Sequence, residues 1–158
     1  MKEYRVTKYN PAFRDSTGAY TRDEWISVKD IGRSFAGVVL TREEYDRVER
    51  AYVSAALTFL REGGVTSLTV SGLENTQRRR LEFQEGTLLP LDQVGDVIKR
   101  VLREEFWCRL QGVDGFVHIG WDFYMYVGVP CPCPEALAQA AELGLYVEEF
   151  SSPYNDEG

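Results

Sequence analysis

Residues 106–129, FWCRLQGVDGFVHIGWDFYMYVGV, predict the fold class, because they contain three strand-like segments separated by short turns. Residues 106–111, 115–120 and 123–129 are rich in β-branched and aromatic residues, which favour strands. The turns between them are Gly112-Val113-Asp114-Gly115 and Gly120-Trp121-Asp122. Connections this short join antiparallel neighbours. The stretch therefore predicts an antiparallel sheet.

Helical patterns lie on both sides of this stretch. Residues 42–62 predict a long helix, since apolar side chains recur there every three or four positions. Thr41 caps its start, Glu44 completes a capping box, and Gly63-Gly64 ends it. A second helix is predicted from Pro90 to about residue 105, and a short third one over residues 134–143.

Further strands are predicted in residues 3–9, 25–28, 66–73, 81–84 and 145–150. The first two are expected to form a hairpin, and residues 81–84 to return beside residues 66–73. No linker or internal repeat divides the chain. The prediction is a single α+β domain over residues 1–158: a largely antiparallel sheet with two main helices and a short C-terminal helix, the helices on one face.

Charge divides the chain into two unequal halves. Residues 1–80 hold 14 basic and 11 acidic side chains (14 − 11 = +3), whereas residues 81–158 hold 4 and 14 (4 − 14 = −10), which gives the −7 of the whole chain. Arg109 is the last lysine or arginine. A field of one sign repels nucleic acid and membrane headgroups and attracts cationic partners. The run Arg78-Arg79-Arg80 does not reverse this, because the aromatics that would stack on RNA bases lie in the acidic half.

The composition indicates an ordinary soluble protein of the cytoplasm. The first residues lack the apolar region of a signal peptide, and no apolar run approaches the roughly 20 residues of a membrane span. Three cysteines, an odd number, fit a reducing compartment better than a disulfide framework.

His118 is the single histidine and the main candidate for catalysis. Oriented by Asp114 or Asp122, it could act as a general base. No Gly-x-Ser-x-Gly or cysteine-containing catalytic signature accompanies it, so the structural interpretation, an imidazole on a strand, is preferred.

The cysteines give a second alternative. Cys108, Cys131 and Cys133, with His118, could supply a Cys₃His zinc site. The Cys-Pro-Cys-Pro spacing argues against it, because structural zinc sites usually take cysteines two to four residues apart. The prediction is no metal and no cofactor.

The segment Gly120-Trp121-Asp122-Phe123-Tyr124-Met125-Tyr126 is the most suggestive for function. As a plain hairpin strand it would direct Phe123 and Met125 inward and Tyr124 and Tyr126 outward. Large aromatics beside acids are also the composition of protein-binding hot spots. Here the chain resembles small bacterial proteins of the immunity type, some of which have a Gly-(Trp/Tyr)-Asp-(Phe/Tyr)-Tyr-Met-Tyr-like strand. Residues 145–154, LYVEEFSSPY, resemble the end of such proteins as well.

The resemblance implies a role rather than an architecture, since immunity-type proteins neutralise a toxin domain by direct binding. Together with the charge it predicts a non-enzymatic acidic protein that occludes the active site of a cationic toxin, such as a nuclease. Two alternatives are a small hydrolase or transferase using His118, and a homo-oligomeric regulatory domain such as a homodimer. The expected partner-binding residues are Trp121, Asp122, Tyr124, Tyr126, Glu148, Glu149 and Tyr154.

Overall fold

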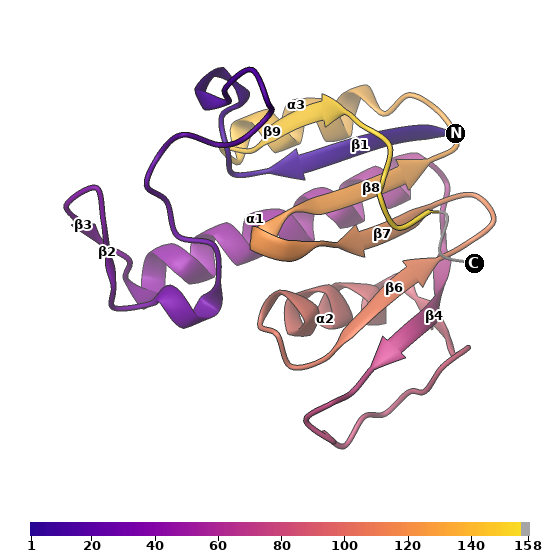
Figure 1. Cartoon of the computed structure of the whole chain (residues 1–158). Coiled ribbons are helices and arrows are strands. Elements are labelled where there is room, and N and C mark those ends of the chain that lie inside the picture. Colours follow the sequence, from indigo (N-terminus) through magenta and orange to yellow (C-terminus); the bar gives the residue numbers. More distant parts are fainter. Residues whose placement is uncertain (156–158) are drawn as a thin grey trace.

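A computed structural model describes residues 1–155, which form one antiparallel sheet with helices on one of its faces (Figure 1). The seven strands lie in the order β5-β4-β6-β7-β8-β1-β9, and every neighbouring pair is antiparallel. Their bounds are Lys2–Thr7 (β1), Ser67–Glu74 (β4), Leu88–Pro90 (β5), Trp107–Gln111 (β6), Phe116–Ile119 (β7), Met125–Val129 (β8) and Tyr146–Glu149 (β9). The α+β class is confirmed.

The three helices are α1 (Arg42–Glu62), α2 (Leu91–Leu102) and α3 (Pro134–Glu142). The long helix begins and ends where its sequence signals lie: Thr41 Oγ1 accepts a hydrogen bond from Glu44 N at 3.1 Å, and Gly64 takes a φ of +78° just past the end. The carboxylate of Glu44 pairs with Arg47 rather than with the cap. No helix in the described part of the chain is long and apolar enough to cross a membrane.

The predicted first hairpin is wrong. Strand β1 lies between β8 and β9, and residues 25–28 form no strand but lead into a 3-10 turn, Val28–Asp30 (η2). The reason is that Trp25 is buried in the core and Ile26 N donates to the carboxylate of Asp30 at 2.9 Å. A second small hairpin, β2 (Ser34–Phe35) with β3 (Val38–Val39), lies apart from the main sheet.

The predicted return strand at residues 81–84 is also wrong, because the pairing of β4 starts later in the chain, at Leu88–Pro90. Residues 75–87 form an irregular loop. Its Glu85 carboxylate accepts from the backbone N–H groups of Gly72 and Leu73 at 2.9 and 2.8 Å. The Glu85 side chain thus accepts the backbone hydrogen bonds that a neighbouring strand would otherwise accept.

The sheet has two different faces. The face toward the helices is aliphatic and forms the core, with residues such as Val6, Val70 and Val127 fully buried. The opposite face is polar and aromatic: Arg5 lies opposite both Tyr126 and Glu148 in register. The C-terminal segment after β9 crosses this second face in front of β8 and β7 (Figure 1). The sheet is therefore covered on both sides, by helices and by its own C-terminal segment.

Candidate functional site

The connection between β7 and β8 is a strained turn. It forms a short 3-10 element, Trp121–Phe123 (η3), in which Asp122 and Phe123 have φ values of 62° and 65°. Two successive non-glycine residues in the left-handed region cost roughly 1–3 kcal/mol each, and such strain is common at functional sites. The turn buries Phe123 but leaves Trp121 85% exposed. It presents a large aromatic side chain to solvent.

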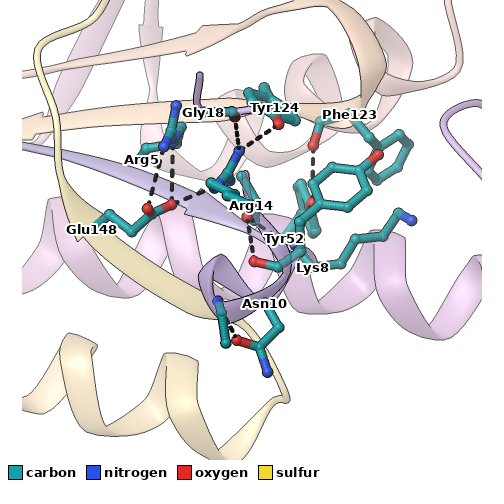
Figure 2. A network of polar contacts seen from close by, with 12 residues as sticks. Arg5, Lys8, Asn10, Arg14, Gly18, Tyr52, Phe123, Tyr124 and Glu148 are labelled. Atoms are coloured by element: carbon teal, nitrogen blue, oxygen red, sulfur yellow. Dashed lines mark hydrogen bonds and ion pairs between the residues drawn. The ribbon is translucent and has the colours of Figure 1, made fainter. Parts of the chain in front are cut away.

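Two buried tyrosine hydroxyls hold this turn in place. Tyr9 Oη donates to the carbonyl of Asp122 at 2.5 Å, and Tyr52 Oη donates to the carbonyl of Phe123 at 2.9 Å. Figure 2 shows that Tyr52 in turn accepts from the backbone N–H of Lys8, at 2.8 Å. The turn is thus fixed from α1 and from the segment that follows β1, and Trp121 projects from a rigid base.

The turn forms one wall of a cleft of about 370 Å³. The other walls come from the connection between α2 and β6, the end of β4, the segment before η2 and the C-terminal segment. In Figure 1 the β7–β8 and α2–β6 connections lie at the same end of the sheet. The floor of the cleft consists of buried apolar side chains: Val101, Leu102, Phe106, Ile119 and Phe123.

Aromatic side chains form the walls. Trp107 donates from Nε1 to the carbonyl of Ile119 at 2.8 Å, and its ring centroid lies 5.6 Å from that of Tyr154. Gly120 makes this close packing possible, since a Cβ there would lie 2.9 Å from the Tyr154 hydroxyl. Together with the exposed Trp121, these two rings line the cleft above its buried floor.

The rim is acidic. Glu74, Glu104 and Asp122 come from three different elements, and all three are exposed. None of the lining residues in the described part of the chain is lysine, arginine or histidine. Glu104 accepts from Ser27 Oγ at 2.5 Å, while Lys29 Nζ lies 4.0 Å from it on an exposed side chain. Of the three acids, only Glu104 has an ion pair among the described residues, so the rim stays net negative.

The structure brings three of the seven predicted partner-binding residues together in this cleft: Trp121, Asp122 and Tyr154. Glu149 lies elsewhere, exposed on the edge strand β9, with its carboxylate 3.6 Å from Lys2 Nζ. The remaining three are held in contacts within the protein.

Tyr126 is on the polar face of the sheet, as alternation predicts, but it does not reach solvent. Its side chain is 6% exposed, because the rings of Phe150 and Tyr154 lie over it with centroids at 6.0 and 6.2 Å. The C-terminal segment buries it, and alternation along one strand gives no sign of such a cover.

Glu148 and Tyr124 belong to the network in Figure 2. Glu148 accepts two hydrogen bonds from Arg5 at 3.2 Å and one from Arg14 at 3.4 Å. Arg14 also donates to the Tyr124 hydroxyl at 2.9 Å. Two arginines therefore balance the charge of Glu148, which ties the loop after β1 to β9 and to the end of the η3 turn.

His118 is fully buried, and both of its ring nitrogens have partners. Nδ1 lies 2.6 Å from Ser152 Oγ, and Nε2 lies 2.7 Å from Gln111 Oε1. Burial lowers the pKa of His118 to about 3, with a smaller effect from the positive charge of Arg109. A neutral ring then donates from Nε2 to Gln111 and accepts at Nδ1 from Ser152. The predicted orienting acids contact neither nitrogen, and His118 lines no cleft described above.

The cysteines do not gather around His118. Cys108 and Cys133 are buried and Cys131 is exposed. Cys133 Sγ lies 3.7 Å from the carbonyl of Phe59. Within residues 1–155, no three histidine, cysteine, aspartate or glutamate side chains are placed to hold a metal ion.

Sequence reasoning missed Glu74, Glu104 and Trp107. They reach the cleft from the end of a strand, the end of a helix and a strand start, so no spacing in the sequence connects them. Comparisons with protein-family models, with curated proteins and with solved structures return no match for this chain.

Proposed function

We propose that this protein is a non-enzymatic acidic binding protein, an immunity-type inhibitor that neutralises a cationic toxin by occluding its active site. The observation that supports the proposal most is the cleft, with its apolar floor, its aromatic walls and a rim whose charged residues are all acidic. Exposed apolar surface surrounded by polar groups is typical of protein-binding sites. The acidic rim indicates that the partner is basic.

Charge supports the same partner over a longer range. Residues 81–158 have a net charge of −10, and they include the cleft residues Glu104 and Asp122. Complementary fields speed the diffusional encounter of two proteins and disfavour partners of like charge. A nuclease that binds phosphate needs a basic active site, and an acidic inhibitor fits that site in place of the substrate.

Trp121 is the proposed anchor. An exposed tryptophan costs free energy in water, and its burial at an interface makes it one of the commonest hot-spot residues. Its fixed turn lowers the cost of ordering the surface on binding. Such an inhibitor protects the cell that makes the toxin, so we propose that it acts in the cytoplasm, where its three free cysteines stay reduced.

A pull-down of the tagged protein from its native cells, at low and high salt, tests the proposal. We expect one stoichiometric basic partner, identified by mass spectrometry, with binding that weakens as salt rises. Adding this protein should abolish the enzymatic activity of that partner.

Matched variants then locate the interface. Trp121→Ala should lose most of the binding, whereas Val113→Ala, at another exposed apolar position, should keep it. Glu104→Gln should weaken binding more than Glu149→Gln, which removes the same charge far from the cleft. Full binding by Trp121→Ala would reject the cleft as the interface, and a dimer in light scattering that Trp121→Ala dissociates would assign the cleft to self-association instead.

A further inference from the structure

We infer that the cleft receives a short basic segment of the partner that inserts one large apolar side chain between flanking lysine or arginine residues. The inference rests on the proposed function, because it names the part of a basic partner that this site recognises. It follows from how apolar and charged groups are distributed with depth in the cleft.

The floor selects an apolar side chain. Leu102, Phe106 and Ile119 lie at the bottom of the cleft, and all three are buried. The three carboxylates are exposed at the mouth and not at the floor. A guanidinium or ammonium group that reached the floor would lose its water without gaining a carboxylate, which is costly. An aliphatic or aromatic side chain gains free energy there, because its apolar surface leaves water.

The size of the cleft fits a single anchor. A volume of about 370 Å³ corresponds to roughly twelve waters at ~30 Å³ each. That space takes one large side chain and the backbone on either side of it. The recognised unit is therefore an extended segment or the tip of a loop.

The rim selects the flanking residues. Glu74, Glu104 and Asp122 line the cleft from three separate segments, namely β4, the α2–β6 connection and η3. Carboxylates on separate segments can pair with cations on both sides of the anchor. Trp121 is exposed and adds an aromatic face on which a guanidinium can stack. An acidic segment with the same anchor would meet like charges at each of these positions.

Three capped peptides test the inference, with the cores Arg-Phe-Arg, Arg-Ala-Arg and Glu-Phe-Glu. Binding to the full chain is measured by calorimetry and by tryptophan fluorescence at low ionic strength. We expect Arg-Phe-Arg to bind, Arg-Ala-Arg to bind about tenfold more weakly because the anchor is gone, and Glu-Phe-Glu not to bind. Trp121→Ala and Glu104→Gln should each weaken the Arg-Phe-Arg complex, and Glu149→Gln should not.

Two outcomes would overturn the inference. Equal affinity of Arg-Phe-Arg and Arg-Ala-Arg would mean that the surface binds charge alone. Equal affinity of Arg-Phe-Arg and Glu-Phe-Glu would mean that the rim does not select basic flanking residues.

A failure of the proposed function would give different results. If a toxin is captured through Trp121 but the three peptides do not differ in affinity as expected, only the assignment of the apolar anchor is wrong. If the peptides bind in the expected order and the cells yield no basic partner, the toxin assignment is wrong and the cleft's specificity stands.

Discussion

At the scale of single residues, hydroxyl groups hold the functional turn. Tyr52 is fully buried, and its hydroxyl pairs with the carbonyl of Phe123 in the strained part of η3. Tyr52→Phe keeps the ring packed but leaves that carbonyl and the Lys8 N–H unpaired, at a cost of about 1–3 kcal/mol in the free energy of unfolding. We expect a lower urea midpoint and weaker partner binding, because Trp121 loses its rigid base.

Tyr146→Phe is the matched control, since it removes a hydroxyl from a partly exposed side chain on β9. It should change neither the urea midpoint nor the affinity. Wild-type affinity in Tyr52→Phe would show that the hydroxyl does not position the turn.

The single histidine makes the free energy of unfolding depend on pH. The pKa of His118 is lowered by burial to about 3 in the folded chain, against 6.5 in the unfolded chain. Between these values the unfolded chain binds more protons, so the stability that is fully present above pH 6.5 is lost as the pH falls toward 3. From pH 7 to pH 5 we expect a loss of about 2 kcal/mol, at 1.36 kcal/mol per pKa unit.

Urea denaturation at a series of pH values measures this loss. His118→Gln removes the titrating group, so most of the slope between pH 7 and pH 5 should disappear even if the variant is less stable throughout. A slope that stays unchanged in this variant would assign the proton uptake to carboxylates instead.

Single residues also show why a count of acids along the sequence overestimates the number of acids that are available to a partner. Glu148 and Glu149 are adjacent, and both are predicted to bind the partner. Strand alternation, however, directs Glu148 toward Arg5 and Arg14 and leaves Glu149 at the sheet edge. A carboxylate balanced by two half-buried arginines attracts no partner. The free acids at the cleft, Glu74 and Asp122, lie far apart in sequence.

At the level of helices and strands, the sequence predicts features that depend on neighbouring residues, such as helix bounds and the pairing of successive strands. The Thr41 cap and the apolar periodicity gave the bounds of α1, and short turns gave the antiparallel order of β6, β7 and β8. Long-range pairing was not predictable in this way. Strand β1 pairs with β8 and β9, near the other end of the chain, and no turn signal connects them. The same holds for the site: Trp121 and Asp122 are neighbours, and Glu74 and Glu104 join them only through the fold.

The C-terminal segment is an element without regular structure that shapes the cleft. Ser152 Oγ accepts from Tyr154 N at 3.2 Å and lies 2.6 Å from His118 Nδ1, so it ties this segment to β7. Ser152→Ala should lower the free energy of unfolding by about 1–2 kcal/mol and weaken partner binding, because Tyr154 forms a wall of the cleft.

Ser151→Ala is the matched control, since the neighbouring side chain is exposed. Thermal unfolding and affinity should both match the wild type in that variant. If Ser152→Ala loses stability but keeps full affinity, the segment covers the sheet without shaping the site.

At the scale of the whole molecule, coverage of the sheet explains where the binding site lies. Helices cover one face, and the C-terminal segment crosses the other, over Tyr126 and His118. The aromatic cleft lies at one end of the sheet, between the β7–β8 and α2–β6 connections. Loops at the end of a rigid sheet are common places for binding residues, because the scaffold fixes them while their side chains stay free.

Charge and aromatic surface should then affect different rate constants of complex formation. Rim acids act over a distance, so the double variant Glu74→Gln/Glu104→Gln should slow association several-fold and flatten its dependence on salt. Trp121 acts only after contact, so Trp121→Ala should speed dissociation and leave association nearly unchanged. Stopped-flow mixing with the captured partner, at several salt concentrations, separates the effects on the two rate constants.

The control variant Glu149→Gln/Glu135→Gln removes the same total charge away from the cleft and should reproduce only a small part of the slower association. If this control slows association as much as the rim variant does, the net charge of the molecule guides the encounter, and the position of the acids around the cleft has no part in it.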